Sequence, residues 1–206
     1  FAMVKFYRAA LARGVQPIIA VDLRLREPSD PQGASRLTLL CQNLAGYKNL
    51  TRLVSRGWLE GQVRGEPLIE RSWLTPATTS GLIALSGAQA GDIGRALLQA
   101  RGAQARQALE AWLALFGDRF YIEVQRIGAA GEETYVPAAL ALASEQGVAC
   151  VATNDVRFLL ASDFEAHEAR VCIHDGALLA DPTRTRRYTP QQFLRSPAQM
   201  AALFPE

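Results

Sequence analysis

A short apolar run, Val148–Ala152, is the feature that most constrains the fold of this chain. The run is rich in valine and begins directly after Gly147, which is typical of a fully buried strand. The polar residues Thr153–Asp155 follow it, and α/β folds place their functional side chains at this carboxyl end of a strand. Arg157 lies two residues after Asp155, so both side chains point the same way if the backbone stays extended. The sequence therefore predicts that any site lies here.

Helical and strand patterns alternate along most of the chain, which predicts one α/β domain over residues 1–206, without an internal repeat or linker. Residues 27–34 contain two prolines, an aspartate and a glycine and are expected to form a surface loop. The expected helices cover 3–13, a segment from Asn43 or Ala45 to 54, 92–100, 104–116, 132–146 and 163–174, with short helices from Pro190 and Pro197. The expected strands cover 15–25, 36–41, 81–86, 120–125 and 148–152.

Composition excludes few functions. Of the 206 residues, 49% are hydrophobic and 20% are charged, as in ordinary globular proteins. The net charge of +2 is weak support for a nucleic-acid partner. Cys41, Cys150 and Cys172 show no CxxC spacing and lie in apolar runs, so we expect buried free thiols and a cytoplasmic location. No stretch of the sequence is long and apolar enough to cross a bilayer.

Two local patterns could bind phosphate groups. Gly87–Gly91 is a strand-to-helix turn, but it lacks the Lys-Ser/Thr ending of a nucleotide-binding loop, and Asp92 would repel an anion. We interpret it as a structural turn. Arg184, Arg186 and Arg187 are candidates for contacts with DNA phosphates, but a solvated loop is favoured, because three arginines among polar residues are common on protein surfaces.

A metal site for phosphoester hydrolysis requires several histidine and carboxylate ligands around one cavity. The chain contains only two histidines, His167 and His174, which lie seven residues apart on an expected helix. No HExxH pattern accompanies them. We therefore interpret both as helix-packing or surface residues.

Longer segments of the chain resemble one family. They are ATNDVRF, DFEAHEARVCIHDG, MVKFYRAALARGVQPIIAVDL, LAGYKNLTRLVSRGW, LIALSGAQAGDIGRALL, RFYIEVQRIG and RRYTPQQFLRS. Together they resemble the PHP (polymerase and histidinol phosphatase) domain of the alpha subunits of bacterial replicative DNA polymerases, in the family's order over residues 3–196. The resemblance implies a distorted seven-stranded (β/α) barrel. Because that fold begins with strands that precede Phe1, we expect this chain to lack the first part of the barrel.

The resemblance also implies a degenerate metal site. Metal-binding members carry glutamate at Asp22, cysteine at Ala88, and histidine at both Ile127 and Arg157, whereas Asp155 matches. Alanine and isoleucine have no lone pair to donate, and arginine remains cationic. We therefore expect no metal, with Arg157 paired to Asp22 or Asp155. The degenerate positions are Asp22, Ala88, Glu123, Ile127, Asp155 and Arg157.

Alternative functions stay open at this point. The resemblance implies a non-catalytic domain that stabilises the polymerase and docks its proofreading exonuclease, while magnesium-dependent DNA synthesis resides elsewhere in the full-length protein. The alternative is an active metal-dependent phosphoesterase or 3'-5' exonuclease with metal at Asp22, Glu123 and Asp155. A small-molecule enzyme would rest on fold analogy alone.

Overall fold

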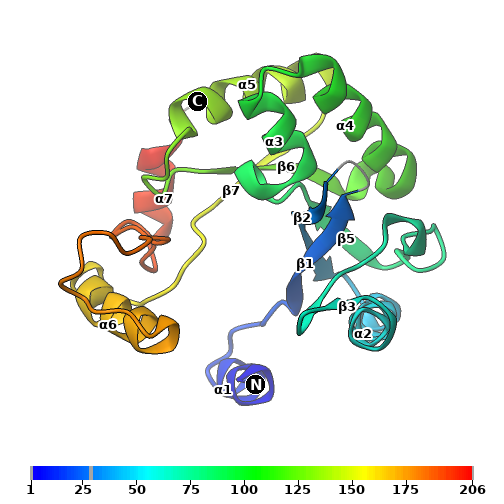
Figure 1. The fold of residues 1–206 in the computed structure, drawn as a ribbon. Helices are drawn as coiled ribbons and strands as arrows, with labels where there is room; N and C mark the ends of the chain where they lie inside the picture. The colour runs from blue at the N-terminus through cyan, green and yellow to red at the C-terminus, as the bar shows by residue number, and fades with distance from the viewer. Residues whose placement is uncertain (1, 28–29, 206) are drawn as a thin grey trace.

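The computed structural model describes residues 2–27 and 30–205, which form an open five-stranded sheet and flanking helices (Figure 1). The strand order is β1-β2-β5-β6-β7; β2 is antiparallel to both of its neighbours, β1 and β5, and β5, β6 and β7 are parallel. The α/β class is confirmed. The seven-stranded barrel is not, because β1 and β7 are separate edges of the described sheet. The strands are β1 (Ala20–Glu27), β2 (Asp30–Cys41), β5 (Leu82–Leu85), β6 (Phe120–Gln125) and β7 (Cys150–Thr153).

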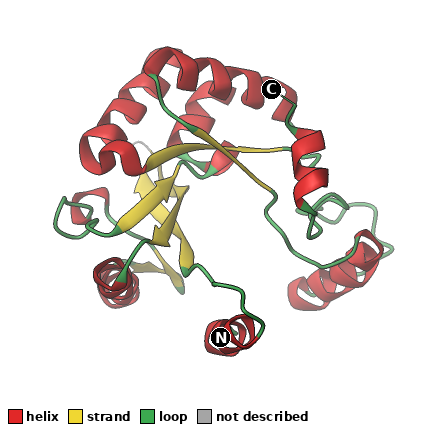
Figure 2. Ribbon diagram, turned by 180° about the vertical axis from the view of Figure 1, so that it is seen from behind, coloured by secondary structure: helices red, strands yellow, loops and turns green. Residues whose placement is uncertain are grey.

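Helices α3, α4 and α5 lie together over the sheet, while α1 and α6 lie further out (Figures 1 and 2). Local signals define several helix ends: the Asn43 side chain accepts a hydrogen bond from Gly46 N and begins α2, and Gly147, in the left-handed conformation, ends α5. The helices are α1 (Met3–Ala12), α2 (Leu44–Glu60), α3 (Asp92–Leu98), α4 (Gly102–Phe116), α5 (Glu132–Gln146), α6 (Phe164–Asp175) and α7 (Pro197–Leu203); the small strands β3 (Gln62–Val63) and β4 (Glu66–Pro67) form a hairpin.

The hairpin of β1 and β2 is longer than the sequence predicted. Residues 27–34 were expected to form a loop, but β2 already begins at Asp30, and Ala34 pairs with Arg26; positions 28–29 lie outside the described residues. The physical reason is side-chain alternation. Leu25 and Leu37 are buried on one face of the hairpin, so strand pairing gains apolar burial that outweighs the local turn signals.

The strand after Gly147 differs from the prediction in its burial. β7 is an edge strand with one neighbour, β6, and its residues Cys150 and Ala152 are exposed. The expectation of a fully buried strand was wrong because a run of small apolar residues cannot show whether a strand has one neighbour or two. The expectation of three buried thiols also fails: Cys172 is buried, Cys41 is half-buried and Cys150 is exposed.

The helix expected from Pro190 does not form. Residues 190–195 instead run beside the segment that follows β7, where Leu194 N donates to Phe158 O and Phe193 forms a bridge with Phe158. Backbone groups used in this pairing cannot make helical hydrogen bonds. Among the described residues, none of the helices has the length and apolar character needed to span a membrane.

Asp92, the first residue of α3, holds three elements together. Its carboxylate accepts a hydrogen bond from Trp112 Nε1 at 3.0 Å and forms an ion pair with Arg71. The guanidinium of Arg71 lies 4.1 Å from the centroid of the Trp112 ring. The turn at Gly87–Gly91 thus leads into a helix whose first carboxylate points into the fold.

Replacing Asp92 with alanine is expected to lower the free energy of unfolding by about 1.5–3 kcal/mol. The substitution leaves the buried Trp112 Nε1 without its acceptor and Arg71 without its counter-charge. Urea denaturation followed by circular dichroism measures the loss. The exposed Asp118 provides the control, because Asp118→Ala should stay within about 0.5 kcal/mol of the parent. Equal stability of the two variants would contradict the role assigned to Asp92.

Candidate functional site

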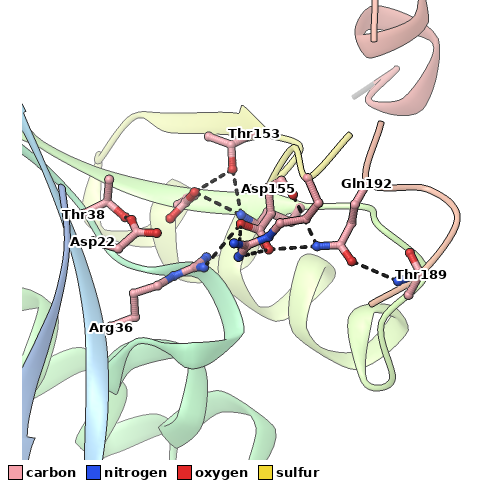
Figure 3. A network of polar contacts seen from close by, with 10 residues as sticks. Asp22, Arg36, Thr38, Thr153, Asp155, Thr189 and Gln192 are labelled. Carbon is pink, nitrogen blue, oxygen red and sulfur yellow. Dashed lines mark hydrogen bonds and ion pairs between the residues drawn. The ribbon is translucent and has the colours of Figure 1, made fainter. Parts of the chain in front are cut away.

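Charged side chains from three strands and one loop meet beside the sheet (Figure 3). We call Asp22, Arg36, Glu123 and Asp155 the polar cluster. Asp22 lies on β1, Arg36 on β2, Glu123 on β6, and Asp155 follows β7. Along their strands, Asp22 and Arg36 alternate with the buried leucines. Their side chains therefore point away from the face of the hairpin that the leucines line.

Glu123 is the most deeply buried member, with 4% of its surface exposed. Its Oε1 accepts hydrogen bonds from Thr153 Oγ1 at 2.5 Å and from Gln125 Nε2 at 3.1 Å. Burial raises the pKa of Glu123, whereas the Thr153 hydrogen bond and the positive charge of Arg36 act in the opposite direction. The net direction is upward, so the surroundings favour the protonated acid relative to water.

Asp155 is surrounded by donors from three segments. Arg157 Nη2 donates to both carboxylate oxygens, at 2.8 and 3.0 Å, and Gln192 Nε2 donates at 2.9 Å. Arg36 Nη1 lies 3.8 Å from Oδ1. Of the two partners expected for Arg157, the structure selects Asp155. Asp22 instead accepts a hydrogen bond from Thr38 Oγ1 at 2.6 Å (Figure 3).

The other two degenerate positions, Ala88 and Ile127, have hydrocarbon side chains that cannot bind a metal. Ala88 is buried in the core and Ile127 is buried near the end of β6. Ala88 and Asp155 both have positive φ, at 50° and 40°, which is uncommon for residues other than glycine. Arg64 and Ala100, which lie outside the polar cluster, also have positive φ, so this conformation does not by itself mark a site.

Sequence reasoning missed Arg36. It assigned the cationic role to Arg157 because Arg157 replaces an expected ligand, whereas Arg36 lies in a strand far from that motif. The available signal was the alternation in β2, where Arg36 and Thr38 flank the buried Leu37. Thr38 pairs with Asp22 across the two strands, so Arg36, on the same face of β2 as Thr38, also lies near Asp22.

Sequence reasoning also missed the role of Asn154 and Gln192, which join the segment after β7 to the segment that precedes α7. Asn154 Nδ2 donates to the carbonyl oxygens of Gln191 and Phe193, at 3.2 and 2.6 Å. Gln192 is buried, its side chain donates to Asp155, and its carbonyl accepts from Arg157 N at 2.8 Å. Both residues occur in segments that carry the family resemblance, but their contact depends on tertiary structure.

The two histidines occupy packing and surface positions. The His167 ring lies 4.8 Å from the Tyr188 ring centroid and 5.5 Å from that of Phe158. His174 is exposed near the end of α6. Neither residue belongs to the polar cluster.

The three arginines of the basic loop, Arg184, Arg186 and Arg187, lie in three different environments. Arg184 Nη1 lies 2.6 Å from Glu168 Oε2, and these side chains are only 7% and 4% exposed. Arg187 pairs with Asp175, and Arg186 is exposed. Arg184 is therefore not available to DNA phosphates, because its charge is directed into a buried ion pair rather than to the surface.

The polar cluster does not fit a resident metal ion. Each of its carboxylates is engaged by protein donors, and two guanidinium groups approach Asp155. Within residues 2–27 and 30–205, histidine, cysteine and carboxylate side chains nowhere form a group of three or more that could hold a metal. A divalent ion would have to displace fixed positive charge, which costs more than binding at a site of ordinary ligands.

Comparisons with known proteins agree with the family resemblance of the sequence motifs. A family model described as "PHP domain" matches residues 1–127. The DNA polymerase III subunit alpha of Pseudomonas aeruginosa is 51% identical over 203 residues, that of Vibrio cholerae is 45% identical over 202, and that of Escherichia coli K12 is 43% identical over 202. Each match covers 98% of this chain and 17% of the relative, so the chain spans about a sixth of these relatives' length.

Proposed function

The chain belongs to the PHP domain family, and we propose that it is the PHP domain of a bacterial DNA polymerase III alpha subunit. The observation that carries the proposal is the identity of 43–51% to such subunits over 98% of the chain. In this proposal the open sheet is part of the family's seven-stranded barrel. The longer polypeptide is a cytoplasmic DNA-directed DNA polymerase, and its magnesium-dependent site lies outside these residues.

We propose that this segment is a non-catalytic scaffold. The engagement of Asp22, Glu123 and Asp155 by hydroxyl, amide and guanidinium donors supports this role, because a carboxylate that already accepts hydrogen bonds from the protein is less available as a metal ligand. The scaffold stabilises the polymerase and docks the proofreading exonuclease with the other replicase subunits. Co-elution of the chain with that exonuclease in gel filtration tests the docking role, and separate elution at micromolar concentration would contradict it.

Elemental analysis of the purified chain is expected to find no stoichiometric zinc or manganese. Phosphatase and nuclease assays with either ion added are expected to match the signal of an Asp22→Asn/Asp155→Asn variant, which controls for contaminating enzymes. Stoichiometric metal, together with hydrolysis that this double variant loses, would establish the alternative: a metal-dependent phosphoesterase or 3'-5' exonuclease.

Replacing Arg186 and Arg187 with glutamine is expected to leave the salt dependence of template binding by the whole polymerase unchanged. Arg187 is already paired with Asp175, and Arg186 is a single exposed charge. The measurement is the slope of log Kobs against log salt concentration. A phosphate contact by either residue would reduce the slope by about 0.9 per contact, which would restore the DNA-binding hypothesis for this loop.

A further inference from the structure

Helix α6 lies apart from the sheet, and the loop that follows it packs back against the helix (Figure 1). Between the helix and the loop is a cavity of about 310 Å³. Both segments contribute polar side chains to its lining: His167, Arg170, His174, Asp175, Arg187 and Tyr188. None of these residues belongs to the polar cluster.

Three side chains that carry nitrogen share one face of α6. His167, Arg170 and His174 follow the three- and four-residue spacing that places helix positions side by side. Tyr188 forms a wall beside them, and the centroids of its ring and of the His167 ring are 4.8 Å apart. The Arg157 guanidinium lies 5.3 Å from the centroid of the same tyrosine ring. The tyrosine is therefore held in place by contacts with two other side chains.

Positive charge exceeds negative charge around this cavity. Arg170 is exposed and forms no ion pair or hydrogen bond within the part of the chain that the structure describes. Among the described lining residues Asp175 is the one carboxylate, and it is paired with Arg187. Glu168 lies on the same helix, but its charge is compensated by Arg184 inside the fold. Arg170 is thus a cation without a counter-charge beside the cavity.

The two histidines add unused hydrogen-bonding nitrogens. His167 Nε2 is buried and has no hydrogen-bond partner among the described residues. His174 is exposed near the end of the helix. Buried polar atoms without a partner are uncommon, and an imidazole nitrogen that carries a proton is satisfied by an acceptor oxygen. An anion rich in oxygen atoms matches this combination of a free guanidinium and imidazole nitrogens.

We propose that this cavity binds the phosphate group of a small molecule, which is either free phosphate or a phosphate monoester. Arg170 supplies charge-assisted hydrogen bonds, for which the planar guanidinium fits phosphate oxygens, and Arg187 is shared between the anion and Asp175. The donors line a cavity and not an exposed stripe, which favours a terminal phosphate over the backbone of DNA. The proposal does not depend on the polymerase assignment.

Isothermal titration calorimetry of the chain, in chloride buffer at constant ionic strength, tests this with inorganic phosphate and methyl phosphate as probes. The parent is expected to bind one phosphate with a Kd of about 1 mM or less. Arg170→Gln should weaken binding about tenfold or more, because it removes a charged hydrogen bond. Arg186→Gln is the matched control, since Arg186 is exposed next to Arg187 but does not line the cavity. This control should change the Kd by less than about twofold.

Asp175→Asn should change the affinity in the opposite direction. It removes the carboxylate that competes with the anion for Arg187, so phosphate should bind roughly three times more tightly or better. Weaker binding by this variant would contradict the sharing of Arg187. Circular dichroism establishes that each variant is folded before its affinity is compared.

Equal losses for Arg170→Gln and Arg186→Gln would overturn the proposal, because net charge and not the cavity would then set the affinity. Absence of saturable binding to the folded parent would overturn it as well. So would tighter binding of a single-stranded oligonucleotide without terminal phosphates, if Arg170→Gln loses it, because the cavity would then serve nucleic acid. Methyl phosphate that binds as tightly as inorganic phosphate identifies the ligand as an ester, and a preference for inorganic phosphate identifies the free ion.

Discussion

Replacing Glu168 with glutamine is expected to lower the free energy of unfolding by roughly 3–5 kcal/mol, the range for breaking a buried ion pair. Glu168 lies on α6, and Arg184 lies in the loop that follows, with both side chains almost completely buried. The variant leaves the Arg184 guanidinium without a counter-charge. Its Nε already has no hydrogen-bond partner among the described residues, so the variant adds a lost counter-charge to a donor that is unsatisfied.

Urea denaturation at neutral pH measures this effect, with Glu165→Gln as the control. Glu165 lies on the same helix but is exposed, so its replacement should change stability by less than about 0.5 kcal/mol. A Glu168→Leu/Arg184→Met double variant removes both charges and should recover most of the loss, because paired charges of this kind often exchange for apolar residues at little cost. Equal losses for the double and the single variant would show that packing, not charge, holds the loop.

Replacing Gly46 with alanine is expected to cost about 3 kcal/mol, the upper end of the range for overpacking. A Cβ at this position would lie 1.8 Å from Gly81 O and 2.5 Å from Gly81 C. Both are backbone atoms at the entry to β5, so relief requires α2 to move away from the sheet. That movement would also disturb the hydrogen bond between Asn43 and Gly46 N that begins the helix.

Gly102→Ala provides a matched control because Gly102 also lies in the first turn of a helix, but a Cβ at this position would meet no atom within 4 Å. Alanine is a better helix former than glycine, so this variant should be neutral or slightly stabilised. Thermal and urea midpoints of the two variants give the comparison. A Gly46→Ala protein as stable as Gly102→Ala would show that the close approach of α2 and β5 relaxes without cost.

Local patterns predicted much of the fold. The strand at residues 120–125 and the helix at 132–146 were expected with the bounds that the structure gives them, because their apolar periodicity and the glycine at 147 are local signals. The hairpin at residues 20–41 was predicted less well. Its prolines and glycine indicate a loop, and only pairing with the opposite strand makes an extended conformation favourable.

The residues of the candidate site were likewise predicted only in part. Comparison of motifs was enough to identify Asp22, Glu123, Asp155 and Arg157, and to recognise that Ala88 and Ile127 cannot donate to a metal. It did not identify Arg36, Asn154 or Gln192, because these residues carry no local signal of the contacts that they make.

The amino-acid sequence by itself determined the family and most of the order of helices and strands, since both depend on residue types and short spacings. The tertiary structure alone decided which arginines approach Asp155 and which segment covers it. Arg36 and Asp155 are far apart in the chain, as are Asp155 and Gln192. The order of the strands in the sheet brings the first pair together, and the path of the chain after α6 brings the second pair together. Contacts of that kind depend on the free energy of the whole fold, which no local pattern contains.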